Sequence, residues 1–422
     1  MKTCPTEAIR VRRGKAAILT ERCIDCGRCS RHCPHNAVKA ASDPLSVLEG
    51  YRYTVALPDP TLYGQFQNLD NIEVVLNALL KVGFDGVFET AKAAGLLADY
   101  ARRYAKDEAK LSPQKKPLIS SACPAVLRLI RMRFPNLLDH IIPIITPMEL
   151  AAILARRDAA AKTGLSPDEI GVFAIVPCPA QVTAVHRPDD LQKPVIDGAL
   201  SVRDMYLKLL TPMKDLKELK PLSMAGRSGV SWAICGGESM ARQDEHFLAV
   251  DGIGQVIQVL EAIEDDRIPD VDFVELCACV QGCVGGGLTV ENPFAAAMHI
   301  RHLTKHLPYC RSDFNTEVRD VSLIQADKEL EFAPVFLLDE DRTAAMEKMR
   351  AIGALERQLP GLLCGSCGAP SCHAFAEDVV LGRAERSDCI FQVRAKMQTV
   401  AGTEDADDFL PSPFRRREKK EE

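Results

Sequence analysis

A pair of cysteines followed by glycines is the feature of this sequence most able to do chemistry. Cys279 and Cys283 lie four residues apart in the run FVELCACVQGCVGGG, which starts as an apolar, strand-like segment. Glycine lacks a Cβ, so the backbone can close tightly around a bulky inorganic group. Two upstream cysteines, Cys123 and Cys178, would complete four thiolate ligands. We therefore predict a buried metal centre, with the loop glycines Gly285, Gly286 and Gly287 around it; the alternative is four unligated core cysteines.

A second cysteine group lies near the N-terminus. Cys23, Cys26, Cys29 and Cys33 have the spacing C-x2-C-x2-C-x3-C and are followed by proline. This is the run of bacterial ferredoxins, in which the fourth cysteine ligates the other cluster. Zinc is the alternative, but zinc sites usually pair two C-x-x-C knuckles. The spacing therefore favours a 4Fe–4S cluster.

The same ligation rule predicts which cysteine completes that cluster. Cys4, in CPTEAI, has the setting of the fourth cysteine of an earlier copy of the run. Cys4 would then share a cluster with Cys23, Cys26 and Cys29. Cys33 would serve a second cluster whose other ligands precede Met1, as expected if the chain starts too late. The alternative is a one-cluster module in which Cys33 is a spare.

The third group lies in the last quarter of the chain. Cys364, Cys367, Cys372 and Cys389 follow C-x2-C-x4-C-x16-C, with a glycine-rich turn around the first three. The pattern resembles the small iron–sulfur domain of corrinoid iron–sulfur proteins and Rnf-type electron-transfer subunits. A 4Fe–4S cluster is predicted, with zinc as the alternative, and the neighbouring His373 is not needed as a ligand.

Alternating strand-like and helix-like segments must position these cysteines. Between residues 50 and 290 apolar runs alternate with amphipathic stretches, which favours an α/β domain with parallel sheets flanked by helices. Cys123, Cys178 and Cys279 each follow a predicted strand, where sites gather in such folds. The predicted domains are 1–42, a ferredoxin-like module; 48–335, a two-lobed α/β domain; 341–395, a helical four-cysteine module; and 396–422, a charged and disordered tail.

Composition excludes several classes of function. The 422 residues carry a formal net charge of −6, so we expect no nucleic-acid partner. No apolar run reaches the ~18 residues of a membrane span, and the N-terminus has no signal-peptide pattern. Sixteen cysteines without a secretory signal indicate a metal protein in a reducing, cytoplasmic compartment. We expect a redox or signalling partner protein.

Three ordered motifs of the central segment resemble the catalytic domain of FeFe-hydrogenases. They are SSACPAV at 120–126, VPCPAQV at 176–182 and ELCACVQGCVGGG at 275–287. The resemblance implies that Cys123, Cys178, Cys279 and Cys283 ligate the 4Fe–4S part of an H-cluster. It also implies that Cys283 bridges to a diiron subsite.

The departures from the family pattern concern proton transfer. Ala122 stands where active enzymes carry a relay cysteine, and Gln181 replaces a lysine that contacts the diiron site. Tyr100 and Ala101 align with an expected acidic pair, whereas Thr146 keeps a hydroxyl. A relay needs donors within hydrogen-bond reach at each step. These changes resemble sensory-type members, with slow or regulatory oxidation of hydrogen.

Two other functions stay open. The first is a non-catalytic 4Fe–4S redox or scaffold protein without the diiron subsite. The second is a structural zinc protein. Cys235, Cys277 and Cys310 match no ligand position in these patterns and are predicted to pack in the core.

Overall fold

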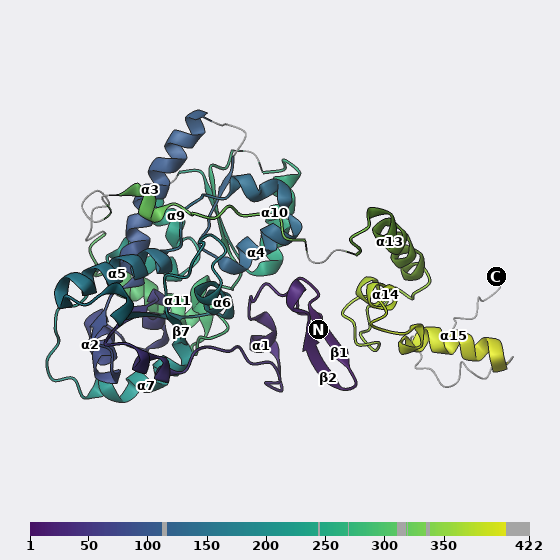
Figure 1. Ribbon diagram of the computed structural model, residues 1–422, viewed down its shortest axis with the longest axis horizontal. Coiled ribbons are helices and arrows are strands. Elements are labelled where there is room, and N and C mark those ends of the chain that lie inside the picture. Colours follow the sequence, from purple (N-terminus) through teal and green to yellow (C-terminus); the bar gives the residue numbers. More distant parts are fainter. Residues whose placement is uncertain are drawn as a thin grey trace, which may run out of the picture. The chain divides into compact units, whose positions relative to one another are not determined.

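The computed structural model describes residues 1–111, 116–243, 245–268, 270–309, 318, 320–334 and 338–401, with the backbone alone for 106–111 and 397–401 (Figure 1). The chain divides into two compact units. The larger unit is Ile24–Pro334, and the smaller combines Met1–Cys23 with Val335–Glu422. Cys310 and the charged tail beyond residue 401 lie outside the described residues.

The larger unit contains two parallel sheets. The first has the order β4-β3-β6-β7, formed by β4 (Gly86–Val87), β3 (Tyr53–Pro58), β6 (Ile170–Val176) and β7 (Gly198–Ser201). The second has the order β5-β9-β8, formed by β5 (Leu118–Ile119), β9 (Phe273–Cys277) and β8 (Phe247–Asp251). Every neighbouring pair in both sheets is parallel. The predicted α/β class with two lobes is confirmed.

Helices cover both faces of the four-stranded sheet. Successive residues of a strand point to opposite faces. On β6, Val172 and Ala174 therefore pack with α3 (Thr90–Leu111) and α5 (Pro147–Thr163) in one core. Phe173 and Ile175 pack with α2 (Ile72–Val82) and α7 (Val202–Lys214) in another. Burial on both sides explains why IGVFAIV is apolar without interruption.

The three-stranded sheet is covered in the same way. Ile119, Val274 and Leu276 share a core with α4 (Pro124–Arg133) and α10 (Ile253–Glu264). The helix α9 (Gly237–Arg242) contacts β9 and β8, and its Arg242 guanidinium lies 3.7 Å from the centre of the Phe273 ring. Shorter or peripheral helices complete the unit: α1 (Arg28–His32), α6 (Pro179–His186), α8 (Arg227–Val230) and α11 (Pro293–Thr304).

The smaller unit joins segments from both halves of the sequence. It contains an antiparallel hairpin of β1 (Ile9–Arg12) and β2 (Lys15–Ile18) and the helices α13 (Arg342–Glu356), α14 (Cys372–Val380) and α15 (Ile390–Ala401). Arg10 and Arg12 both donate to the Asp378 carboxylate, at 2.6 and 2.7 Å. The Val11 amide donates to the Gly368 carbonyl at 2.8 Å. The sequence analysis did not predict this contact.

None of the helices in the described part of the chain is both long enough and apolar enough to cross a membrane.

Candidate metal centre

Two of the predicted central ligands begin helices. Cys123 is the N-cap of α4 and Cys178 is the N-cap of α6, and a proline follows each of them in the first turn. Both follow the carboxyl end of a parallel strand, β5 and β6 respectively. Unpaired amides and the helix dipole favour a negative charge at such a position. The fold therefore suits two thiolates here.

The other two predicted ligands lie on the glycine loop after β9. A Cβ on Gly286 would lie 2.3 Å from the Pro177 carbonyl oxygen, so only glycine lets the loop pack against the residue before Cys178. Gly282 has φ +84°, and a Cβ there would lie 2.4 Å from the Cys235 amide nitrogen. Gly282 therefore fixes the turn between Cys279 and Cys283.

The four thiols influence one another electrostatically. Burial and the neighbouring Cys123 raise the pKa of Cys178 to about 12. Burial and the thiols of Cys178 and Cys123 raise the pKa of Cys279. Burial raises the pKa of Cys283 as well, with contributions from Asp59 and from the thiols of Cys123 and Cys178. Without a cation, four buried thiolates would repel one another; a metal cluster offsets that cost. The structure gathers the four thiols, and their ligation stays a prediction.

The segment that carries Cys26 and Cys29 packs against the glycine loop of Cys279 and Cys283. Arg31 of α1 donates to the carbonyl oxygens of Gly285 and Gly286, the latter at 2.7 Å, and to the Thr289 hydroxyl at 3.3 Å. The charge of Cys26 also contributes to the raised pKa of Cys279. The second ferredoxin-type cysteine is thus held close to the central group.

A cavity of about 70 Å³ adjoins Cys283. Its lining includes Ala122, Cys123, Thr146 and Gln181. By the ~10–15 Å³ that one water needs, it has room for a small polar group. Two buried polar atoms around it, Gln181 Oε1 and Trp232 Nε1, have no hydrogen-bond partner. Because such atoms are normally paired, the cavity is suited to a polar ligand.

Comparison with known proteins identifies the family of this site. The family model "Iron only hydrogenase large subunit, C-terminal domain" matches residues 52–243 and 236–287, which is more than half of the chain. The chain belongs to this iron-only hydrogenase family. Models for an Fe–S cluster domain and for the LdpA Fe–S cluster-binding domain match residues 359–391 and 1–43, so the flanking modules are iron–sulfur domains as predicted.

Relatives of the family fall into two groups by name. The NADP-reducing hydrogenase subunit HndD of Solidesulfovibrio fructosivorans is 23% identical over 63% of this chain and 55% of its own length. Cytosolic iron-sulfur assembly component 3 of Rattus norvegicus is 21% identical over 54% of this chain and 59% of its own length. The chain thus spans little more than half the length of these curated relatives.

Solved hydrogenase structures share the fold. A variant of the FeFe-hydrogenase HydA1 from Chlamydomonas reinhardtii superposes with a TM-score of 0.53 at 14% identity, covering 69% of this chain and 98% of that chain. HydA(deltaEFG), from a structure of stepwise H-cluster assembly, gives 0.53 at 15% identity, covering 67% and 95%. At this identity the likeness shows the fold alone.

The diiron subsite of this hydrogenase family fits the cavity residues. Cys283 reaches the cavity, the unpartnered Trp232 N–H can donate to a polar ligand, and Gln181 offers an amide. Ala122 also lines the cavity, and its place in a proton relay stays a prediction. Tyr100 and Ala101 lie on α3 and are not among the residues lining this cavity.

Thr146 connects the cavity to a buried carboxyl group. Thr146 lines the cavity, is the N-cap of α5 and donates its hydroxyl proton to Glu149 Oε2 at 2.7 Å. Burial and the neighbouring Asp190 carboxylate raise the pKa of Glu149 to about 8. Burial likewise raises the pKa of Asp190. The sequence analysis named Thr146 but missed both carboxyl groups, because no motif places them together.

The C-terminal cysteines gather as their spacing predicted. Cys364, Cys367, Cys372 and Cys389 line one small hollow together with Phe375. Cys372 opens α14, whose N-cap Ser371 accepts from the Ala374 amide. Burial raises the pKa of Cys367, with further contributions from Cys389 and Cys364. This arrangement is suited to one cluster.

The N-terminal cysteines are divided between the two units. Cys4 and Cys23 belong to the smaller unit, while Cys26, Cys29 and Cys33 belong to the larger. The Ala8 amide donates to Cys4 Sγ at 3.2 Å, and the Ala37 amide donates to Cys33 Sγ at 3.3 Å. Amide donors lower the pKa of Cys33. Whether Cys33 serves a second cluster stays a prediction.

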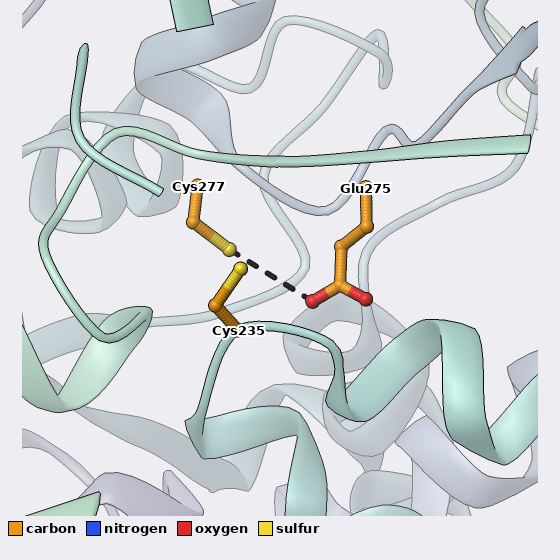
Figure 2. Close-up of side chains that lie close together, drawn as sticks. All are labelled: Cys235, Glu275 and Cys277. Carbon is orange, nitrogen blue, oxygen red and sulfur yellow. Dashed lines mark hydrogen bonds between the residues drawn. The ribbon is translucent and has the colours of Figure 1, made fainter. Parts of the chain in front are cut away.

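One group of potential ligands was missed. Cys235, Glu275 and Cys277 offer donor atoms that all lie within 4.8 Å of one another (Figure 2). The sequence analysis predicts only core packing for both cysteines. The one available signal was the i, i+2 spacing of Glu275 and Cys277 on a strand, which puts both on one face. Nothing in the sequence pointed to Cys235.

Proposed function

We propose that the protein is an iron–sulfur electron-transfer protein of the sensory hydrogenase type. It oxidises hydrogen slowly at an H-cluster-like centre held by Cys123, Cys178, Cys279 and Cys283. The observation that carries this proposal is the seating of α1, through Arg31, on the loop of Cys279 and Cys283. That contact holds a ferredoxin-type cysteine segment on the loop that carries two of the central thiols.

Electron flow explains the need for neighbouring clusters. Oxidation of one hydrogen molecule yields two protons and two electrons, and a 4Fe–4S cluster carries one electron at a time. The central cluster and the cluster of Cys26 and Cys29 therefore accept the pair. The C-terminal cluster on Cys364, Cys367, Cys372 and Cys389 and, if Cys33 serves one, a second N-terminal cluster pass electrons to a partner protein.

Protons leave by a route that replaces the missing relay cysteine. Thr146 lines the cavity and hands a proton to Glu149, whose raised pKa of about 8 lets it gain and lose a proton near neutral pH. A hydroxyl is a weaker relay than a thiol because it rarely ionises. The expected consequence is slow turnover.

A diiron subsite, when bound, supplies the site at which hydrogen is split. Cys283 would hold it, the unpartnered Trp232 N–H would donate to one of its polar ligands, and the amide of Gln181 lines the same wall. The apolar part of the cavity wall, which includes Met148, Leu276 and the Pro124 ring, limits water entry.

Infrared spectroscopy tests this proposal. Protein purified without oxygen and exposed to hydrogenase maturation enzymes should show carbonyl and cyanide stretching bands. Hydrogen should then bleach its iron–sulfur absorption, which oxidised dye should restore. A full set of cubane clusters without those bands would overturn the hydrogen-oxidising role.

A non-catalytic redox or scaffold role is the second candidate. It is favoured by Ala122 in the cavity wall and by a relative named as a cytosolic iron–sulfur assembly component. In that case the clusters would exchange electrons with dithionite and a partner protein but not with hydrogen. The relative's name also supports the expected cytoplasmic location.

Arg31→Gln tests the electron-transfer link itself. Loss of the guanidinium removes its bonds to the glycine loop and a positive charge near the central thiols. We expect the midpoint potential of the nearest cluster to fall by on the order of 50 mV, roughly 1 kcal/mol of lost charge stabilisation. Redox titration followed by electron paramagnetic resonance measures this.

Arg28→Gln is the matched control, because Arg28 lies exposed on the same helix. Its potentials should match those of the parent protein. Equal shifts in both variants would show that the Arg31 contact does not tune the central cluster.

A further inference from the structure

Cys235, Glu275 and Cys277 form a compact donor group outside the predicted cluster ligands. Cys277 Sγ lies 3.9 Å from Glu275 Oε1, and the donor atoms of all three residues lie within 4.8 Å of one another (Figure 2). We propose that this group binds a single thiophilic divalent cation of the Zn²⁺ or Fe²⁺ class, separate from the iron–sulfur clusters.

The backbone holds the three side chains in place before any metal arrives. Glu275 and Cys277 are alternate residues of β9, so their side chains project from the same face. Cys235 lies on the turn that precedes α9, and its amide donates to the Gln281 carbonyl at 3.2 Å. The next amide, of Gly236, donates to Glu275 Oε1 at 2.8 Å. A preformed site lowers the ordering cost of binding.

The spacing of the donors suits one ion. Zinc binds thiolate at about 2.3 Å and carboxylate oxygen at about 2.0–2.2 Å in tetrahedral geometry, which sets sulfur–sulfur and sulfur–oxygen separations of about 3.8 and 3.5 Å. The Cys277–Glu275 separation of 3.9 Å exceeds that value by a few tenths of an ångström. Rotation about the side-chain torsions is sufficient to close the difference.

The Glu275 carboxylate is oriented as metal-ligating carboxylates are. Ser239 donates to Oε2 twice, from its amide at 2.9 Å and from its hydroxyl at 2.8 Å. Oε1 accepts the Gly236 amide and the Cys277 thiol proton, so deprotonation of Cys277 on metal binding would free a lone pair of Oε1 on the side of that sulfur. Hydrogen-bonded support of this kind fixes ligand direction and raises metal affinity.

The remaining coordination position has access to the central cavity. Glu275 and Cys277 both line that cavity together with Cys283. Three protein ligands with one open position are the arrangement of zinc sites that keep a bound water. The ion would therefore hold a water at the edge of the cavity.

Zinc uptake by the cluster-loaded protein tests the site. Anaerobic protein with its full iron and sulfide content is incubated with ZnCl₂, desalted and analysed for zinc. We expect one tightly held zinc in addition to an unchanged iron content. The zinc K-edge absorption should give a shell of two sulfurs near 2.3 Å with oxygen at about 2.0–2.2 Å.

Variants separate this site from the cluster ligands. Cys235→Ser and Cys277→Ser should each abolish the extra zinc, and Glu275→Gln should weaken its binding by about 10–100-fold. Iron content should stay constant in all three, which shows that they fold. Cys310→Ser is the matched thiol control and should keep the zinc.

Three results would overturn the proposal. The first is zinc uptake that is the same in the parent protein and in Cys235→Ser. The second is a shell of sulfur alone, which would place the zinc in a cluster position. The third is a Cys235–Cys277 disulfide in anaerobic protein. Because zinc and iron are counted separately, these results leave the hydrogenase proposal untouched.

Discussion

Ala122 is the residue whose substitution we expect to raise the rate of hydrogen oxidation most. It lines the cavity beside Cys123 and has no proton to exchange. A positioned acid–base group contributes about 10²–10⁴-fold to a rate. We expect Ala122→Cys to raise hydrogen oxidation by about 10²-fold in protein that carries the diiron subsite, measured by dye reduction under hydrogen.

Ala122→Ser separates proton transfer from side-chain size. Serine is nearly as large as cysteine but far less acidic, so it should change the rate little. An unchanged rate in an Ala122→Cys protein whose infrared bands prove the diiron subsite would count against this explanation of slow turnover.

Glu149 should make stability depend on pH. Burial and Asp190 raise its pKa to about 8, whereas an unfolded glutamate has a pKa near 4.3. Between these values the folded state keeps a proton that the unfolded state has lost. The contribution of Glu149 to stability is therefore full below about pH 4 and is lost as pH rises to 8, by on the order of 5 kcal/mol.

Glu149→Gln should flatten this dependence in thermal unfolding at pH 5.5, 7 and 8.5. Glutamine preserves the capping box with Thr146, so the helix start is retained. Glu169→Gln is the control, because the pKa of Glu169 is lowered to about 2 by Arg52 and the carboxylate stays ionised throughout this range. If Glu149→Gln shows the same pH dependence of stability as the parent protein, groups other than Glu149 cause that dependence.

At the scale of elements, the glycine loop should tolerate no side chain at Gly286. A Cβ 2.3 Å from the Pro177 carbonyl would push the Cys279–Cys283 loop away from the Cys178 loop. We expect Gly286→Ala to cost about 2–3 kcal/mol and to lower the iron content by one cluster. Iron analysis and thermal unfolding measure the two effects.

Gly254→Ala supplies the matched control for that substitution. Gly254 lies in α10, and no atom is within 4 Å of the added Cβ. Alanine should therefore stabilise the protein slightly, by ~0.5–1 kcal/mol. Equal iron loss in both variants would mean that the tight loop is not what holds the cluster.

Local patterns predicted the elements better than the contacts between them. The apolar run of β6, the helix start at Pro124 and the strand-end positions of Cys123 and Cys178 all follow from residue type and period. The position of the Cys235 turn beside β9 could not be predicted. It depends on the close packing of Gly282 against the Cys235 amide. That contact spans two loops with no shared motif.

At the scale of the whole molecule, buried charges hold the smaller unit together. Arg10 and Asp378 are 4% and 3% exposed, so removing one partner leaves a buried charge unpaired. Such losses cost about 3–5 kcal/mol. We expect Asp378→Asn to release the β1–β2 hairpin to proteolysis while the larger unit stays resistant.

Asp339→Asn is the control, since its partner Lys348 and Asp339 itself are about one-third exposed. A surface pair of this kind contributes about 0–1 kcal/mol, so cleavage should be unchanged. Equal cleavage of the hairpin in Asp378→Asn and the parent protein would show that the ion pairs do not retain it.

The contact between the β1–β2 hairpin and α14 could not be predicted from the sequence. Each cysteine motif is read from residues close together along the chain, and three such motifs were found. The Arg10–Asp378 bond joins residues 368 positions apart, and no local period or motif encodes such a pairing.

That separation has a consequence during protein synthesis. A ribosome adds about 5–20 residues each second, and domains generally fold as they emerge. The β1–β2 hairpin leaves the ribosome before the α/β domain, whereas Asp378 of its partner α14 is made 368 residues after Arg10, behind that whole domain. For tens of seconds the nascent hairpin is therefore exposed to chaperones and proteases, and the smaller unit is the last part of the protein to close.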